Sequence, residues 1–439
     1  MKNSGGFKIL ILFVLVFLFF QSCKKEAEVT YPVIKVSQPS ENQTFGVLDT
    51  IQIKAEITHT KNLTNVSMAV VDMNLIPVTN SFNTYPNQQN YTINTNIIIS
   101  NIELSSGNYY LHIRATDGVN ETNSYTKIYI NEAPYILENV FLITKTPLSS
   151  LNISKLDTSL QATNMFNLNS DFGYADVDPI NKLLYICGKY SSKIYCYDYQ
   201  NNAEKWNNMV QGYPPQLYFN DLMVHNKKVY IAIHQNAIIA YNPDGTIMYN
   251  LPTSNDRYPD KIHFHNQFLI SSQHAISNQN TFININYLES GGFCQLLQLN
   301  LKIIKFISKD DNNIYVFAND LSDNAELRIY DMTSNGVWEP YNLGTGKMVA
   351  AEKIDNNSYF IAYENKIIKF SYNPIGAVPF ISNISPVSMK FDFTSQKLYV
   401  VTTDKKIMRY SYPFGTLEKQ VSVSDSICEL VLGYNKPVE

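Results

Sequence analysis

The chain has 439 residues, of which 45% are hydrophobic and 16% are charged, and its formal net charge is −4. This length predicts two or three domains, and the apolar content is ample for packed cores. No basic stripe accompanies the small net charge, which argues against a nucleic-acid partner. The 31 tyrosines and 23 phenylalanines favour β-structure.

Residues 1–22 have the pattern of a secretory signal. Lys2 and Lys8 precede an unbroken apolar run over 9–20, and Ser22 stands before Cys23. A positive start, a short apolar core and a small residue before the cut define such signals. The run is shorter than the ~20 apolar residues that a membrane-spanning helix needs.

The stretch 19–23 (FFQSC) resembles the lipobox of bacterial lipoproteins. Ser22 matches the small residue of that motif, whereas Phe20 and Gln21 depart from its usual Leu and Ala or Ser. The resemblance implies cleavage before Cys23 and a membrane anchor of diacylglycerol, with chains such as palmitate, on its sulfur. Two or more acyl chains anchor a protein stably. The alternative is an ordinary cleaved signal beside an unrelated cysteine.

A charged tether, 23–31, follows the anchor. Its segment 24–28 (KKEAE) loosely resembles the lysine-plus-acid export signal of Bacteroidetes lipoproteins. That resemblance implies the outer membrane and the cell surface. A solvated tether with no sorting role is the alternative, so the side of the membrane stays open.

Residues 32–132 are predicted to form a β-sandwich, because about 100 residues carry short alternating strands between turns. The stretch 104–118 resembles the penultimate strand of bacterial immunoglobulin-like and fibronectin-type-III-like modules, with Tyr109 as the corner tyrosine and Leu111 in place of the antibody cysteine. The resemblance implies a spacer or an adhesive unit. The strand candidates are 33–36, 50–57, 65–72, 91–100, 108–115 and 124–130.

Residues 134–439 contain a repeat of short strands centred on an apolar or aromatic anchor. The anchors recur every 39 to 46 residues, and stepping back one period from the first reaches Leu142. This period with strands alone predicts a seven-bladed β-propeller of four-stranded blades. Strand 428–434 is predicted to close the ring as the inner strand of the first blade, which removes an open sheet edge. The anchors are Tyr185, Tyr230, Leu269, Tyr315, Phe360 and Tyr399.

The blade 175–198 resembles the YVTN, quinoprotein-like and WD40-like propeller superfamilies. The WD dipeptide is absent, and only two tryptophans exist, Trp206 and Trp338. The resemblance therefore implies a fold and not a function.

Cys187 and Cys196 lie in two strands around a turn at Ser191 and Ser192. If Tyr190 pairs with Lys193, the cysteines face each other and a disulfide is possible in an exported protein. Two free buried thiols are the alternative. No CxxC spacing occurs, which argues against zinc.

The chain contains no Walker loop, GxSxG elbow or HExxH motif. His263 and His265 lie on one strand face and could begin a metal site, but no third ligand is evident. Asp176 and Asp178 could bind calcium, or they could cap the turn before Pro179. We therefore expect no metal and no cofactor.

The loops at one rim of the predicted ring carry residue types enriched in binding hot spots. An inert rim is the alternative. The candidates are Tyr213, Tyr218, His234, Arg257, Tyr258 and His274.

The sequence therefore predicts an envelope lipoprotein whose propeller binds a protein or glycan without catalysis. A propeller enzyme acting on a polysaccharide or a small molecule is one alternative, and a structural or adhesive surface protein is another. An enzyme should bring acids or histidines together at the mouth of the ring, and a scaffold should show an aromatic or apolar patch there.

Overall fold

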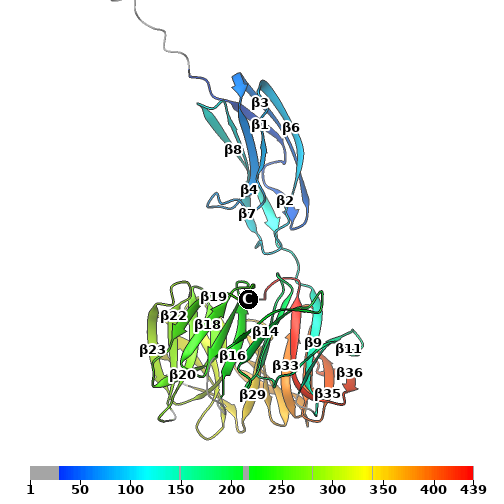
Figure 1. Ribbon diagram of the computed structural model, residues 1–439, viewed down its shortest axis with the longest axis vertical. Coiled ribbons are helices and arrows are strands. Elements are labelled where there is room, and N and C mark those ends of the chain that lie inside the picture. Colours follow the sequence, from blue (N-terminus) through cyan, green and yellow to red (C-terminus); the bar gives the residue numbers. More distant parts are fainter. Residues whose placement is uncertain (1–28, 148–149, 211–216, 279, 339, 439) are drawn as a thin grey trace, which may run out of the picture. The chain divides into compact units, whose positions relative to one another are not determined.

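The computed structural model describes residues 29–147, 150–210, 217–278, 280–338 and 340–438 (Figure 1). Cys23 and the signal lie outside these residues. All regular secondary-structure elements in the described ranges are β-strands. None of the described residues forms a helix able to span a membrane. The chain divides into two compact units, Met1–Pro134 and Tyr135–Glu439.

The first unit is built from two sheets that share one core. Alternate residues of β3 and β6, such as Ile53 and Ile93, pack against Val66, Leu111 and Ile128 from the other sheet. Neighbouring strands are antiparallel except β2 and β8, which are parallel. One sheet has the order β1 (Val33–Gln38), β3 (Thr50–Leu63), β6 (Gln88–Ile98). The other has the order β2 (Gln43–Gly46), β8 (Glu121–Asn131), β7 (Gly107–Thr116), β4 (Asn65–Val71), β5 (Phe82–Thr84).

Tyr109 lies near the start of β7 and its ring is buried. Its hydroxyl donates to the backbone carbonyl of Ser105 at 2.9 Å, and Leu111 two residues on is fully buried. A tyrosine that bonds back to the preceding loop in this way fixes the corner where the chain enters the strand.

The second unit contains, in the described residues, seven antiparallel sheets of four strands, one of them with an extra strand. From inner to outer strand, the first three are β37 (Ser426–Tyr434), β9 (Leu137–Lys145), β10 (Leu151–Leu156), β11 (Ala162–Leu168); β12 (Tyr174–Asp178), β13 (Leu183–Cys187), β14 (Lys193–Asp198), β15 (Ala203–Met209); and β16 (Phe219–His225), β17 (Lys228–Ile233), β18 (Ala237–Tyr241), β19 (Ile247–Pro252).

The other four sheets follow in chain order. They are β20 (Arg257–His265), β21 (Phe268–Ala275), β22 (Thr281–Tyr287), β23 (Phe293–Leu299); β24 (Lys302–Asp310), β25 (Asn313–Asn319), β26 (Ala325–Asp331), β27 (Gly336–Val337) with β28 (Tyr341–Gly344); β29 (Met348–Lys353), β30 (Ser358–Tyr363), β31 (Lys366–Ser371), β32 (Gly376–Ser382); and β33 (Pro386–Asp392), β34 (Lys397–Thr402), β35 (Lys406–Ser411), β36 (Thr416–Ser422).

The seven sheets form a closed ring. Each inner strand contacts the inner strand of the next sheet, and β37 contacts β12. The C-terminal strand β37 pairs along β9, with Val431 opposite Phe141, as the sequence predicts for 428–434 (red beside cyan in Figure 1). Sheets arranged radially in this way are those of a β-propeller.

The repeating anchors lie on the second strand of their sheets, and all of them are buried. Successive residues of such a strand face opposite neighbours: Leu184 packs toward the preceding sheet, and Tyr185 packs toward the following one. Both faces of the strand are covered, which explains why these segments are unbroken apolar runs.

The possible disulfide between Cys187 and Cys196 is not formed, and the alternative of two free buried thiols holds. Cys196 lies opposite Tyr185, and Cys187 lies opposite Ile194. Both thiols are free. They are buried in one apolar cluster, and burial raises the pKa of Cys196 to about 12.

The error lies in the length of the connecting loop. The prediction assumed a two-residue turn at Ser191 and Ser192, but the strands are joined by the five residues 188–192. The carboxylate of Asp171 organises this wider loop by accepting the backbone N–H groups of Lys189, Tyr190 and Ser191. The register therefore moves by two residues, and the cysteines no longer face each other.

Candidate functional site

The inner strands carry a repeated polar position. In six of the seven a β-bulge lies near the strand start. In three of these, a charged residue directly follows the bulge, and the next residue is buried and apolar. These pairs are Asp221 with Leu222, Lys305 with Phe306, and Glu429 with Leu430. Such bulges re-aim the side chains that follow them.

Two carboxylates of the inner strands, one of them in the strand without a bulge, join neighbouring sheets. Asp176 of β12 accepts the N–H of Val224 in β16 at 2.7 Å. Asp221 of β16 accepts the N–H of Ile262 in β20 at 2.9 Å. Each carboxylate therefore satisfies a backbone donor of the next inner strand, and such buried donors are costly when unpaired.

Two lysines of the inner strands pair with acids of the next inner strand. Lys305 Nζ lies 2.6 Å from Glu352 Oε2, and Lys390 Nζ lies 3.8 Å from Glu429 Oε1. Burial alone would lower the pKa of Lys390, but the surrounding carboxylates, chiefly Glu429, raise it overall. The lysine stays charged and balances acids that would otherwise be uncompensated.

A cluster of polar and aromatic side chains forms at the start of β20, and we call it the rim cluster. It consists of His234, Tyr258, Asp260, Lys261 and His274, all of them half-buried. The Tyr258 ring lies between two histidine rings, 4.1 Å from His234 and 5.6 Å from His274, measured between centroids. His274 Nε2 lies 3.1 Å from Asp260 Oδ2, and it donates because the carboxylate can only accept.

Lys261 is the cation of this cluster. Its ammonium lies 4.9 Å from the centroid of the Tyr174 ring on β12. Burial tends to lower the pKa of Lys261, but Asp221 and Asp260 raise it overall. Burial raises the pKa of Asp221 to about 6 and that of Tyr174 to about 12. The cluster therefore presents a fixed cation between two carboxylates.

The histidines differ in their surroundings. Burial lowers the pKa of His234, so this ring is neutral at neutral pH. Asn220 places its amide nitrogen 3.3 Å from His234 Nδ1 and donates to the Pro259 carbonyl at 2.7 Å. Asn220 thus ties β16 to β20 beneath the rings.

The rim residues predicted from the sequence separate into two groups. His234, Tyr258 and His274 come together in the rim cluster. Tyr218 is buried in the core between sheets, where only its backbone supports the site, by accepting the N–H of His234. Tyr213 lies outside the described residues. The expectation that Tyr218 lines the rim is wrong, because its ring fills the space between two sheets.

Arg257 also lies apart from the cluster's chemistry. Its guanidinium carbon lies 4.7 Å from the centroid of the Phe282 ring, and its Nε lies 3.3 Å from Asp256 Oδ1. The side chain is therefore held against its own sheet by a cation–π contact.

Among the described residues no group of three or more His, Cys, Asp or Glu could hold a metal ion. Asp178 accepts the N–H groups of Ile180 and Asn181, which is the turn cap that the sequence offered as the alternative to calcium. His263 and His265 share a different partner, the hydroxyl of Ser308.

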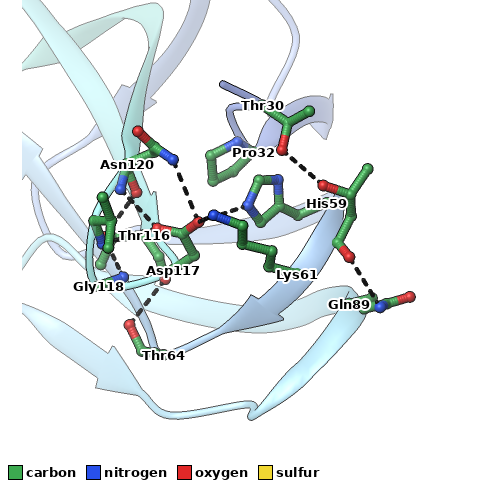
Figure 2. A network of polar contacts seen from close by, with 12 residues as sticks. Thr30, Pro32, His59, Lys61, Thr64, Gln89, Thr116, Asp117, Gly118 and Asn120 are labelled. Carbon is green, nitrogen blue, oxygen red and sulfur yellow. Dashed lines mark hydrogen bonds and ion pairs between the residues drawn. The ribbon is translucent and has the colours of Figure 1, made fainter. Parts of the chain in front are cut away.

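The first unit has its own buried polar network (Figure 2). His59 Nε2 lies 3.0 Å from Asp117 Oδ2, and both side chains are almost fully buried. Asp117 also accepts the N–H groups of Val119 and Asn120, and these bonds hold the pKa of its carboxyl well below its usual range. Nearby, Thr122 donates to the Pro32 carbonyl at 2.6 Å and fixes the point where the chain enters the unit.

Sequence reasoning missed Asp260, Lys261 and Asp221, and it assigned Asp176 to calcium or a turn cap although this carboxylate accepts the N–H of Val224 on the next inner strand. Asp260 and Lys261 directly follow Tyr258 and Pro259, and Tyr258 was already a rim candidate, so adjacency was an available signal. The carboxylates had only a faint signal, an acid at the third position of two inner strands, Asp176 in β12 and Asp221 in β16.

No protein-family model and no curated protein matches the chain. Solved structures similar to the chain include hydrazine synthase of Kuenenia stuttgartiensis, with a TM-score of 0.48 and 13% identity over 66% of this chain and 97% of that chain. BamB of Moraxella catarrhalis has a TM-score of 0.44 and 10% identity over 67% and 93%. The computationally designed Ika8 protein has a TM-score of 0.47 and 10% identity over 66% and 86%. These values are too low to place the chain in a family.

Proposed function

We propose that this chain is a cell-envelope lipoprotein, anchored by lipid on Cys23, whose seven-bladed β-propeller binds a protein or glycan partner through the rim cluster. The first unit is an immunoglobulin-like spacer. The proposed location is the outer membrane. Labelling of intact cells tests whether the protein lies on the cell surface.

The rim cluster carries this proposal. Its three aromatic rings lie in contact and are half-buried, and Asp260 and Lys261 stand beside them as hydrogen-bonding groups held in place by neighbouring strands. A rigid aromatic surface flanked by fixed polar groups suits recognition, because little side-chain entropy is lost on binding.

The fold supports the rest of the proposal. Seven four-stranded sheets whose inner strands contact in a closed ring are what a seven-bladed propeller requires. The corner hydrogen bond of Tyr109 and the two-sheet core support an immunoglobulin-like spacer.

The pair of Asp260 and His274 favours a second candidate, a propeller enzyme acting on a polysaccharide or small molecule. The two side chains come from paired strands of one sheet, β20 and β21. A His–carboxylate pair orients and charges an imidazole, which suits proton transfer. Among the described residues, no acid or histidine of another sheet forms a hydrogen bond with Asp260 or His274, and we therefore favour binding over catalysis.

The experiment is affinity capture of the intact lipoprotein from detergent-solubilised envelopes, together with a glycan array. A partner that co-purifies stoichiometrically, or a glycan class that binds, supports the proposal. Turnover of a bound glycan supports the enzyme. The absence of both a partner and a glycan contradicts the binding role.

A further inference from the structure

Ser308 lies between two histidines at the other end of β20 from the rim cluster. Its Oγ lies 3.0 Å from Nε2 of His263 and 2.9 Å from Nδ1 of His265. Ser308 belongs to β24, and both histidines belong to β20. The three side chains therefore meet across two neighbouring sheets.

A backbone contact of His265 determines which of its ring nitrogens carries the proton. His265 Nε2 lies 3.0 Å from the backbone carbonyl oxygen of Asp311. A carbonyl can only accept, so Nε2 carries the proton. In the neutral ring Nδ1 is then a bare acceptor, and the Ser308 hydroxyl must donate to it. His263 Nε2 in turn donates to the serine oxygen.

This direction of hydrogen bonds polarises the hydroxyl. The serine oxygen accepts a hydrogen bond from His263 on one side and donates its own proton toward His265 on the other. The base is oriented by a third group, which is the arrangement that activates serine nucleophiles. Burial, followed by the nearby His265, lowers the pKa of His263 to about 3, so His263 is neutral and donates through a single N–H.

The packing buries the base more completely than the serine. His265 is buried, with 4% of its surface exposed, whereas Ser308 is half-buried. The register of β24 shifts between Ser308 and Asp310, so Lys309 is an extra residue in the strand. Bulges of this kind occur next to active sites, where they re-aim a side chain.

We propose that Ser308 is an activated nucleophile that accepts acyl groups from small carboxylic esters, with His265 as its general base. His265 Nδ1 takes the hydroxyl proton while Oγ bonds to the ester carbonyl carbon. The bond from that carbon to the alcohol oxygen breaks, and the imidazolium returns its proton to the departing alcohol. Water then attacks the acyl-serine through the same base, which releases the acid and restores the hydroxyl.

The test uses the full-length protein and a fluorophosphonate probe, which phosphonylates activated serines and releases fluoride. We expect the probe to label Ser308 at least about tenfold faster than Ser334, because a positioned base contributes roughly 10²–10⁴-fold. Ser334 is the matched control: it is an exposed serine that donates to a carboxylate, Asp331, rather than to a histidine. Peptide mass spectrometry locates the adduct, and p-nitrophenyl acetate reports hydrolysis.

Two variants separate activation from a structural role. His265→Gln keeps an amide donor for the Asp311 carbonyl but is not basic, so labelling should fall at least about tenfold while the unfolding temperature is retained. If this variant unfolds, Ser308→Cys provides the second measurement, since iodoacetamide should alkylate it faster than Cys294. The proposal would be overturned if Ser308 were not labelled in the wild type. It would also be overturned if a folded His265→Gln protein were labelled as fast as the wild type. Ser308 would then be a hydrogen-bonded link between two sheets.

Discussion

The two units handle buried carboxylates differently. In the first unit Asp117 is satisfied mainly within its own turn, by the N–H groups of Val119 and Asn120, and its pKa falls. In the ring Asp221 receives a donor from another sheet, Ile262, yet burial raises its pKa to about 6. The first unit thus satisfies this buried carboxylate mainly with nearby backbone donors. In the ring the donor comes from another sheet and does not offset the cost of burying the charge.

The two units also differ in the longest sequence separation that their strand pairs bridge. Every strand pair of the first unit joins residues between 33 and 131. The ring is closed by a pair between β37 and β9, which lie almost 300 residues apart.

Deletion of residues 426–439 should have the largest effect. It removes β37, exposes the inner edge of β9 and opens the ring, and open edges invite aggregation. Hydrogen exchange should lose protection in β9 and β10 while β3 and β7 stay protected. Intact protection of β9 in the truncated chain would contradict the closed ring.

Asp221→Ala should destabilise the ring by about 3–5 kcal/mol, because it removes one of the two carboxylates beside Lys261 and leaves the Ile262 N–H unpaired. Chemical denaturation followed by tryptophan fluorescence measures this, since both tryptophans lie in the second unit. The matched control is Asp256→Ala, which removes an exposed carboxylate of the same region and should change the unfolding free energy by about 0.5 kcal/mol or less. Equal losses in the two variants would show that Asp221 is no interstrand link.

The pH dependence of the two units should have opposite signs. The pKa of Asp221 is higher in the folded protein than in the unfolded chain, so protonation stabilises the ring as pH falls from about 6 to 4. The pKa of Asp117 is lowered on folding, so its contribution is present above about pH 4 and is lost below it. Asp221→Asn should remove the gain between pH 6 and 4, and an unchanged slope would count against this assignment.

Tyr109→Phe should have the smallest effect, a loss of about 1 kcal/mol from the first unit, since it removes one hydrogen bond and keeps the ring packing. Hydrogen exchange in β7 measures it. No change in protection would mean that the bond to Ser105 contributes nothing to the corner.

The same contrast explains how much of the structure could be predicted from the sequence. The all-β class, the repeat and the strand that closes the ring were predictable, because period and apolar runs are properties of local segments. The corner role of Tyr109 was expected from the resemblance to immunoglobulin-like modules, and its hydroxyl does bond back to Ser105. The Cys187 register was not predictable, because Asp171 widens the loop from sixteen residues upstream of Cys187. The partners of Asp221 and Ser308 were not either, since each lies on a neighbouring sheet.

The most direct test of the central claim is a titration of the captured partner or glycan against wild type, Tyr258→Ala and Tyr287→Ala. Tyr258 is the middle ring of the rim cluster, and Tyr287 is an exposed tyrosine at the far end of the same sheet. Removing a central aromatic anchor should weaken binding by at least about 2 kcal/mol, some thirtyfold in Kd, while Tyr287→Ala leaves Kd unchanged. Equal Kd values for wild type and Tyr258→Ala would contradict the assignment of the rim cluster as the binding site.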